Sequence, residues 1–365
     1  MKYVLIGDAE SPHLLKWARE LNERVNLWVV SSRGFSPAFD AFLPAERRFA
    51  FNAQPGWKGW ISVFFKVTRL GNWLAKVDSD WINPHYLTSH GLLAATVRRL
   101  YGLRARLVGS AWGSDVLLAP QRGALQRFLL RWIIGECDVM TSDSHYMADS
   151  MRLLRSCDVM VFPFGLDGIP DAELKSERLF FTSRGLEPIY RPLRVLEIFK
   201  NIVNRWPDAH LVVANSGSLR GQLEQWVIQS DLVKCVEFVG HLSALEQARY
   251  YARARWFFSV PSSDAVSVSV LEAMSHGCYP IVSDLPANRE LIEDRVNGLV
   301  VADGQVQVVD LLPGDSSVLD KIGKRNRDWI KLHALFGPSI QQFLLHLQKL
   351  YPIHENDTYC LKDGG

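Results

Sequence analysis

The feature that most constrains the fold is the recurrence of short apolar runs, each followed by an amphipathic stretch. Tyr3–Ile6 is such a run, and the stretch after it opens at Ser11-Pro12 and keeps helical spacing to about Glu23. An apolar run that returns through a helix to the next run is typical of a parallel sheet with crossover helices. The pattern therefore predicts an α/β fold.

The apolar runs fall into two series. The first series comprises the runs at 3–6, 27–30, 80–83, 106–109, 139–141 and 159–163. The second series comprises the runs at 179–182, 209–214, 235–239, 256–260 and 279–282. Two such series in one chain predict two Rossmann-like, doubly wound domains that face each other across a cleft.

Chain length and linker composition give the expected domain boundaries. A chain of 365 residues fits two domains of about 150–200 residues each. Gly165 and Gly168 cluster where the first series ends, which is typical of a linker. We therefore expect an N-terminal domain over 1–168, a C-terminal domain over 169–337, and a final segment, 338–365, whose helix packs back on the first domain.

Composition narrows the class of protein. The net charge of +2 is too balanced for a nucleic-acid binder. The five cysteines are scattered without metal-ligand spacing, as expected for reduced thiols in the cytosol. No stretch reaches the roughly 18 apolar residues of a membrane-spanning helix, and the N-terminal apolar run is a strand and not a signal peptide. We expect a cytoplasmic protein that is soluble or peripherally bound to the inner face of the membrane.

Residues 42–76 are both aromatic and basic, and two interpretations remain open for them. Their aromatic and basic members include Arg47, Arg48, Phe49, Phe51, Trp57, Lys58, Trp60, Phe64, Phe65, Lys66, Arg69, Trp73 and Lys76. Several of the aromatic residues follow helical spacing, so one interpretation is a helix whose apolar face belongs to the core. The other is a surface where aromatic side chains insert into a membrane and basic ones meet anionic lipid.

The segment that carries most chemistry is 260–298, VPSSDAVSVSVLEAMSHGCYPIVSDLPANRELIEDRVNG. A strand ends in a tight turn, and a helix follows over about 267–276. The first turn of this helix contains only short side chains, Ser267, Val268 and Ser269. Its unpaired backbone N–H groups and the helix dipole favour a diphosphate at this position.

Two carboxylates flank that turn. Asp264 precedes the helix and can reach sugar hydroxyls, whereas Glu272 lies one to two turns inside it and can accept two hydrogen bonds from a ribose diol. Taken alone, Glu272 is better explained as a surface residue of a strand–helix unit. The complete string of residues favours a nucleotide-sugar site.

This string resembles the motif of the family 4 retaining glycosyltransferases of the GT-B fold. That motif has an acid, seven residues, Glu, Ala-Met, a small residue, Gly and Pro, and later Asn-x-x-Glu and Asn-Gly. The matching residues here are Asp264, Glu272, Ala273, Met274, Gly277, Pro280, Glu290, Asn297 and Gly298. Asp264 replaces the usual Glu, and Ser267 the usual Gly. The resemblance covers nearly the whole chain in order and is strongest over 260–298.

The resemblance implies further donor-binding residues in the second domain. Arg184 follows the first strand of that domain, where the family places an Arg against the diphosphate. A Lys usually follows; here Arg191 either takes its place or is a surface charge. Gly217 lies in the loop where the family has Gly-x-Gly. His241 and Leu242 are expected to flank the nucleobase through backbone groups.

In the first domain the resemblance implies an acceptor side. Trp112 replaces the His that the family places near the reacting sugar, so its role is limited to packing or one N–H donor. Asp115 either orients a sugar hydroxyl or caps the following helix. His13, His85 and His90 are weaker candidates for lining the acceptor side, because a lone His is more often structural.

The reaction that the resemblance implies is transfer of a hexosyl group from a nucleotide-diphosphate sugar to an acceptor hydroxyl, with retention at the anomeric carbon. The candidate catalytic residues are Asp264, Glu272, Asp115 and Arg184. We see no nucleophile with an adjacent base, which favours front-face transfer assisted by the leaving phosphate. No cofactor is expected besides the donor, and no Asp-x-Asp pair or His cluster suggests a metal.

Other functions and several acceptors remain possible at this point. The loss of the family's His and Lys also fits a nucleotide-sugar-binding subunit without activity, and a GT-B-type epimerase has a similar two-domain build. A phosphorylase would need a cofactor-binding lysine, which we do not find. The basic and aromatic first domain favours a lipid-linked saccharide acceptor in cell-surface polysaccharide or lipopolysaccharide assembly.

Overall fold

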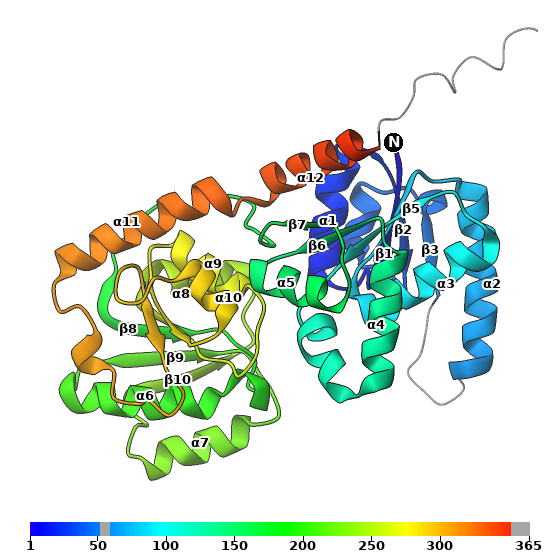
Figure 1. Cartoon of the computed structure of the whole chain (residues 1–365). Helices are drawn as coiled ribbons and strands as arrows, with labels where there is room; N and C mark the ends of the chain where they lie inside the picture. The colour runs from blue at the N-terminus through cyan, green and yellow to red at the C-terminus, as the bar shows by residue number, and fades with distance from the viewer. Residues whose placement is uncertain (52–58, 352–365) are drawn as a thin grey trace, which may run out of the picture. The chain divides into compact units, whose positions relative to one another are not determined.

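The structure is a computed structural model that describes the backbone of residues 1–51 and 59–351, and the side chains of 1–51 and 67–351. The chain divides into two compact units (Figure 1). Among the described residues, the first unit comprises Met1–Ser142, Ala148–Met160 and Gly337–Tyr351. The second comprises Asp143–Met147 and Val161–Phe336.

The first unit is built on a seven-stranded sheet in the order β3-β2-β1-β4-β5-β6-β7. Its strands are β1 (Lys2–Gly7), β2 (Asn26–Ser31), β3 (Arg48–Ala50), β4 (Trp81–Pro84), β5 (Arg106–Ser110), β6 (Val139–Ser142) and β7 (Val159–Val161). The strands from β3 to β6 pair in parallel. Strand β1 is buried from Tyr3 onward, as its apolar sequence predicts for a central parallel strand.

Helices cover this sheet. They are α1 (Pro12–Asn22), α2 (Gly59–Val77), α3 (Leu92–Tyr101), α4 (Ala124–Glu136), α5 (His145–Leu154) and α12 (Phe336–Leu350). Buried side chains of α2 and α3 pack with β1, β2, β4 and β5 in one core cluster. Helix α12 returns to this unit, where Phe343 meets Trp17 of α1 at 6.0 Å between ring centroids.

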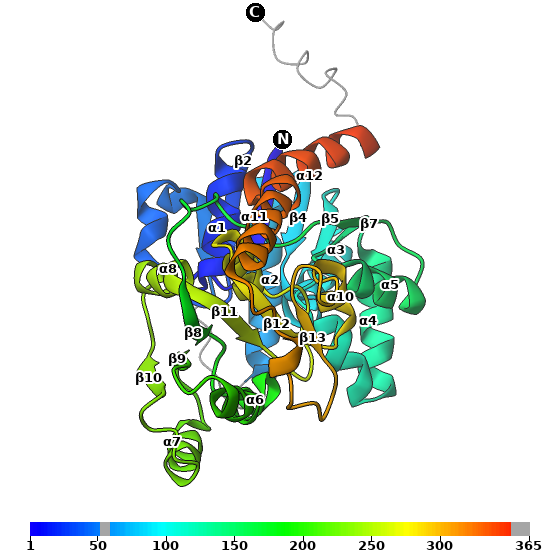
Figure 2. The same ribbon diagram turned by 90° about the vertical axis from the view of Figure 1, so that its left-hand side faces the viewer.

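The second unit contains a six-stranded sheet in the order β10-β9-β8-β11-β12-β13, and every neighbouring pair is parallel. Figure 2 shows this order from β10 at one edge to β13 at the other. The strands are β8 (Ser176–Thr182), β9 (His210–Ala214), β10 (Val236–Gly240), β11 (Ala254–Ser259), β12 (Tyr279–Ser283) and β13 (Leu299–Val301).

Helices cover both faces of the second sheet. They are α6 (Pro192–Arg205), α7 (Arg220–Gln229), α8 (Ala244–Arg253), α9 (Val268–Ser275), α10 (Pro286–Leu291) and α11 (Ser316–His333). One core cluster joins the sheet to α6 and α7, and another joins it to α8 and α9. Figure 1 shows these two helix pairs on opposite faces. The second unit is therefore a doubly wound α/β layer with its own core.

The predicted fold class is confirmed: each unit is a Rossmann-like parallel sheet covered by helices, and the C-terminal helix packs on the first unit. Each of the eleven predicted runs overlaps a strand, and five of them extend one or two residues beyond it. Two short edge strands, β3 and β13, were not predicted. No helix in the described part of the chain is long and apolar enough to cross a membrane.

Each sheet has a point where the strand order reverses, at β1/β4 in the first unit and at β8/β11 in the second. Ligands of doubly wound proteins bind outside the carboxyl ends of the strands at this point. A ligand site is therefore expected at the loops after β1, β4 and β5 in the first unit and after β8 and β11 in the second.

Some of the described aromatic side chains of residues 42–76 pack against the core of the first unit. They are Phe49, Phe51 and Trp73. The Arg48 guanidinium bonds to the Phe39 carbonyl and to Asp40. The core interpretation is confirmed for these side chains. Those of Trp57, Lys58, Trp60, Phe64, Phe65 and Lys66 lie outside the described residues.

Candidate functional site

The centre of the candidate site is the side chain of Arg184. One of its terminal nitrogens donates to Asp264 Oδ2 at 2.7 Å. The other donates to Ser267 Oγ and, at 3.3 Å, to Ser269 Oγ. The guanidinium also lies 4.4 Å from the centre of the Tyr190 ring. Four of the residues predicted for the donor phosphates and sugar thus lie together: Arg184, Asp264, Ser267 and Ser269.

The topology of the second sheet explains this convergence. Arg184 lies two residues after β8 and Asp264 lies five residues after β11. The two strands are hydrogen-bonded neighbours, with Phe181 opposite Phe257. Residues just beyond their carboxyl ends therefore meet at the reversal point of the sheet.

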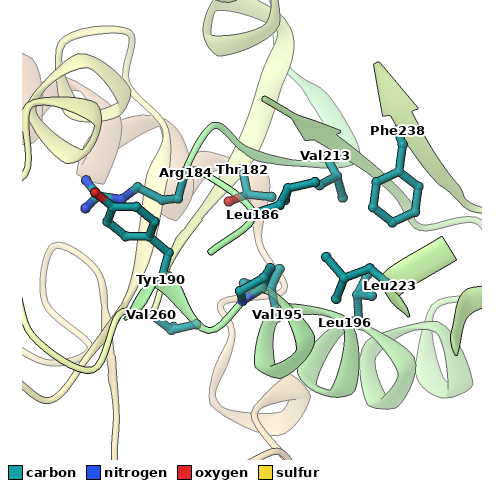
Figure 3. Close-up of a pocket in the computed structure, with 11 residues that line it drawn as sticks. Thr182, Arg184, Leu186, Tyr190, Val195, Leu196, Val213, Leu223, Phe238 and Val260 are labelled. Atoms are coloured by element: carbon teal, nitrogen blue, oxygen red, sulfur yellow. The ribbon is translucent and has the colours of Figure 1, made fainter. Parts of the chain in front are cut away.

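An apolar hollow adjoins Arg184 within the second unit. Its lining residues are Thr182, Arg184, Leu186, Tyr190, Pro192, Val195, Leu196, Val213, Leu223, Phe238 and Val260. Figure 3 shows Arg184 and Tyr190 at one end of this hollow, with apolar side chains of α6 and the sheet at the other. The charged group of Arg184 is thus the polar end of an apolar recess.

Two carboxylates near this centre have altered proton affinity. Burial raises the pKa of Asp264, and the Arg184 guanidinium opposes that rise. Burial also raises the pKa of Asp143 to about 7, and the neighbouring Asp264 and Glu290 carboxylates add to it. Asp143 Oδ2 accepts the Val266 N–H at 3.1 Å and so supports the loop that carries Asp264. Asp143 was not predicted as a site residue.

Glu272 interacts with the buried hydroxyl of Tyr251. This hydroxyl is hydrogen-bonded to Ser183 Oγ at 2.8 Å and accepts from Gln247 Nε2 at 3.2 Å. Burial raises the pKa of Tyr251, with the Glu272 carboxylate contributing through charge and a hydrogen bond. Tyr251, from α8, therefore connects the residue before Arg184 with the carboxylate predicted to bind ribose.

The other predicted donor residues lie in several environments. Arg191, the candidate second cation, has φ +48° and pairs with Asp303 at 2.6 Å. A Cβ at Gly217 would lie 2.4 Å from the Leu186 carbonyl oxygen, so a glycine is required where these two loops meet. His241 is exposed, while Leu242 and Val268 pack partly against the α8–α9 core.

Several other motif residues have structural partners. Asn297 donates to the Leu291 carbonyl and accepts the Glu293 N–H, which fixes the turn after α10. Glu290 accepts the N–H groups of His145 at 2.8 Å and Tyr146 at 2.6 Å, at the start of α5. These residues hold the loops around the centre in place.

In the first unit, the predicted acceptor-side residues gather around Trp112. The Trp112 ring lies 5.3 Å from the His13 ring and 5.4 Å from the His85 ring, between centroids. It also stacks on Tyr86 at 5.7 Å with an interplanar angle of 14°. These residues follow β1, β4 and β5, so they surround the reversal point of the first sheet.

The ionisable groups beside this aromatic cluster are either kept neutral by burial or fixed by hydrogen bonds to the backbone. Burial lowers the pKa of His85 to about 3, and it also lowers the pKa values of His13 and His90. His90 Nδ1 donates to the His85 carbonyl at 2.7 Å. Asp115 accepts the Trp112 N–H at 3.0 Å and the Leu87 N–H at 2.8 Å. These contacts with loop backbone are neither of the two roles predicted for Asp115, which were to orient a sugar hydroxyl or to cap the following helix.

Sequence reasoning missed Tyr190, Tyr251, Asp143 and Tyr86. Tyr86 and Tyr190 are each next to a predicted residue, so adjacency was the available signal. Asp143 lies two residues after a predicted strand, where parallel sheets place functional residues. Tyr251 lies in a helix with no motif, and its contact with Glu272 arises only from tertiary packing.

No group of three or more metal-ligating side chains lies in the part of the chain that the structure describes. The arrangement offers instead a guanidinium, two serine hydroxyls and a helix N-terminus for an anion, with two carboxylates nearby for hydroxyl groups. A diphosphate bearing sugars on both sides matches this set of groups.

Comparisons with known proteins agree with this chemistry. Residues 2–144 match the family model "Glycosyl transferase 4-like", and residues 176–310 match "Glycosyl transferases group 1". A phosphatidyl-myo-inositol mannosyltransferase of Mycobacterium tuberculosis is 27% identical over 271 residues, which are 71% of this chain and 69% of that protein.

Solved structures share the fold over nearly the whole chain. HepE of Anabaena, in complex with UDP-glucose, has a TM-score of 0.75 at 16% identity, over 96% of this chain and 100% of that one. The lipopolysaccharide outer core galactosyltransferase WaaB has a TM-score of 0.70 at 15% identity, over 95% and 100%. Each half of the chain matches a glycosyltransferase family model, and the whole chain shares the fold of known glycosyltransferases. The chain therefore belongs to the family 4-like glycosyltransferases of the GT-B fold.

Proposed function

We propose that the protein is a retaining hexosyltransferase that uses a nucleotide-diphosphate sugar and acts on a saccharide or lipid-linked saccharide. The observation that carries the proposal is the Arg184 cluster at the β8/β11 reversal point. There a side chain that is only 15% exposed is held by Asp264 and by two serines of the α9 first turn. A guanidinium at a helix N-terminus is a strong diphosphate site.

Each group has a role in this proposal. Arg184 and the Ser267–Ser269 turn bind the diphosphate, and their positive charge stabilises it as it departs. Glu272, positioned by Tyr251, accepts hydrogen bonds from the ribose hydroxyls. Asp264, fixed by its bond to Arg184, binds hydroxyls of the transferred sugar. Since HepE was solved with UDP-glucose, UDP-sugars are the first donors to test.

The bond changes follow from these roles. The bond between the anomeric carbon and the phosphate oxygen breaks, and the acceptor oxygen bonds to the same carbon on the same face. The acceptor proton passes to the departing phosphate oxygen. Burial keeps His13 and His85 neutral, which makes them unsuited to supply a permanent positive charge. Catalysis then rests on positioning and on charge stabilisation.

A thermal-shift screen of the full chain against UDP-, GDP- and ADP-sugars tests the donor, since a ligand of the folded state raises Tm. Transfer or hydrolysis of the stabilising donor tests the activity, and NMR of the product's anomeric centre tests retention. Glu272→Ala should abolish the shift while the fold, checked by circular dichroism, persists. Stabilisation without turnover would favour a non-catalytic binding subunit, and no stabilisation by any donor would refute the proposal.

Helix α4 supports a peripheral, cytoplasmic position at a lipid surface. Leu125 and Phe128 on this helix are 65% and 66% exposed. Arg127 and Arg131 lie beside them, exposed and without an ion pair in the described part of the chain. No acidic residue occurs over 116–135. Exposed apolar side chains next to unpaired arginines fit an anionic membrane surface, and the mycobacterial relative is named for a phosphatidyl lipid.

Vesicle flotation tests the membrane surface. Replacing Arg127 and Arg131 by Glu should release the protein from vesicles that contain phosphatidylglycerol, because about 1 kcal/mol of attraction is lost per basic residue. Arg205→Glu with Arg253→Glu makes the same charge change on the second unit and should retain binding. Equal flotation of both double variants would contradict a specific surface on α4.

A further inference from the structure

The second unit has a cavity of about 520 Å³ at the amino ends of its strands. Its wall is formed by the segment that leads into β8, the start of β11, the turn after α9 and one side of α11. A cavity of this volume admits a small organic molecule. The donor site proposed above lies at the opposite, carboxyl ends of β8 and β11. The cavity is therefore a separate place on the same unit.

The wall of this cavity contains a half-buried amine, that of Lys175, directly before β8. Its Nζ donates to the Tyr251 carbonyl at 2.7 Å and to Cys278 Sγ at 3.7 Å. Tyr251 and Cys278 are buried, so both partners lie on the protein side of the amine. In the neutral amine the two N–H bonds point to these partners, which leaves the lone pair for the side that faces the cavity. Such an amine is positioned to attack a carbon atom there.

The surroundings of Lys175 favour the neutral, nucleophilic form of its amine. Burial lowers the pKa of Lys175, the nearby Cys278 opposes this shift, and the Arg255 and Arg327 guanidinium groups add to it. Burial also lowers the pKa of His276, on the same wall, to about 4, and the charges of Lys175 and Arg327 contribute. A lysine beside other cations is one of the ways in which proteins make an amine nucleophilic near neutral pH.

The positive charge of the wall is only partly neutralised. The wall carries four cations and three carboxylates: Lys175, Arg255, Lys324 and Arg327, and Glu173, Glu177 and Asp320. Glu177 and Asp320 both pair with Arg255, at 2.7 and 2.6 Å. Lys324 and Arg327 lie one turn apart on α11, and neither forms an ion pair in the described part of the chain. A reagent with an anionic leaving group is attracted to these two side chains, beside the amine.

We propose that Lys175 is a modification site that is acylated by acyl phosphates entering this cavity. The Nζ lone pair attacks the acyl carbon, an N–C bond forms, and the bond between that carbon and the phosphate oxygen breaks. One amine proton leaves with the phosphate, so a neutral amine and an acyl phosphate give an amide and inorganic phosphate. Arg327 and Lys324 stabilise the phosphate as it departs.

Acetylation of the folded, full chain by acetyl phosphate at neutral pH tests the site, with peptide mass spectrometry as the readout. Lys331, exposed on α11, is the internal reference. Lys175 should be acetylated about fivefold faster than Lys331, because a larger fraction of its amine is neutral. In denaturing urea the two rates should become equal, since the preference arises from the fold. A Lys175 rate no higher than that of Lys331 in the folded chain would overturn the modification site.

A charge variant tests the assignment to acyl phosphates. Lys324→Gln removes a cation of the wall and should slow acetyl phosphate at Lys175 about threefold. N-acetoxysuccinimide, an acetylating reagent without charge, should be slowed less. Lys321→Gln, on the same helix but outside the cavity wall, is the matched control and should change neither rate. Equal effects of Lys324→Gln on the two reagents, with folding verified by circular dichroism, would refute the preference for an anionic leaving group.

Discussion

Arg184 depends on the shape of its guanidinium as well as on its charge. It contacts Asp264, two serines and the face of Tyr190 at the same time. A lysine ammonium keeps the charge but cannot reach these groups in a planar fork. Arg184→Lys should therefore weaken nucleotide-sugar affinity at least tenfold, measured by calorimetric titration.

Arg178→Lys provides the matched control. Arg178 lies on the same strand, β8, toward its amino end, where its guanidinium covers the Trp206 ring at 3.9 Å. Its replacement should leave donor affinity within about twofold, since ligands bind at the carboxyl ends of the strands. Equal losses in the two variants would show that Arg184 acts only through the stability of the unit.

Tyr251 should act on donor binding without touching the donor. Tyr251→Phe removes the hydroxyl that joins Ser183, Gln247 and Glu272, so the Glu272 carboxylate loses its fixed position. We expect the donor KM to rise about fivefold and kcat to change little, with about 1 kcal/mol lost in unfolding free energy. Tyr250→Phe, next to it in α8, is the control. A fall in kcat with an unchanged KM would argue against a positioning role.

Asp143 makes stability depend on pH. Burial raises its pKa to about 7 in the folded state, from a usual value of 3.8. Between these values the folded chain holds a proton that the unfolded chain has released, so stability falls as pH rises through this window. Asp143→Asn has no proton to lose there. Relative to this variant, the native protein should lose about 2 kcal/mol between pH 5 and 8.

Urea unfolding at several pH values measures this difference. Asp149→Asn, on the exposed side of α5, is a control that should run parallel to the native protein at every pH. A constant difference between the native protein and Asp143→Asn from pH 5 to 8 would contradict a raised pKa at Asp143.

At the scale of elements, the contact of α11 with the end of α9 depends on a glycine. A Cβ at Gly323 would lie 2.7 Å from the Gly277 carbonyl oxygen, so α11 would have to move outward. Overpacking of this kind costs about 1–3 kcal/mol, which exceeds the gain of about 1 kcal/mol from replacing a helical Gly by Ala. Gly323→Ala should therefore lower Tm.

Gly221→Ala separates the cost of overpacking from the gain in helix propensity. Gly221 lies in α7 with nothing within 4 Å of its Cβ position, so only the helix-propensity gain remains. We expect its Tm to rise, as measured by calorimetry. A rise in both variants would show that α11 accommodates the methyl group without cost.

The long central strands could be predicted because burial on both faces leaves an apolar run in the sequence. β3 and β13 are three residues each, too short to be distinctive, whereas the equally short β7 was predicted because its apolar run continues to Pro163. Arg184, Asp264 and Ser267 could be predicted because they follow strands that are neighbours. The sequence could not decide between the two interpretations of Arg191, because its partner Asp303 is 112 residues away in the sequence.

Side chains whose role depends on tertiary packing could not be predicted either, because such contacts leave no local signal in the sequence. Tyr251 belongs to a helix whose polar face resembles that of any surface helix. Its contact with Glu272 exists only once α8 and α9 lie on the same sheet face. The backbone strain at Tyr86, which has φ +65°, likewise has no local signal, because its surroundings enforce it.

At the scale of the whole molecule, the first and the last described helices of the chain, α1 and α12, belong to the same unit. Helix α12 follows the second unit in sequence but buries Ile340, Phe343 and Leu347 in the first. The second unit retains its own two core clusters, which contain no residue of α12 beyond Phe336. Removing the chain after Phe336 should therefore expose apolar surface of the first unit alone.

This deletion tests whether the units are independent in stability. Losing three fully buried large side chains costs several kcal/mol at roughly 2 kcal/mol each, which is a large fraction of a domain's stability. Calorimetry of the chain ending at Phe336 should show one transition moved down and one retained. The retained transition should still rise with the nucleotide sugar that stabilises the full chain, because the Arg184 cluster lies wholly in the second unit. A single transition that falls as a whole, without donor stabilisation, would mean that the donor site requires the first unit to be folded.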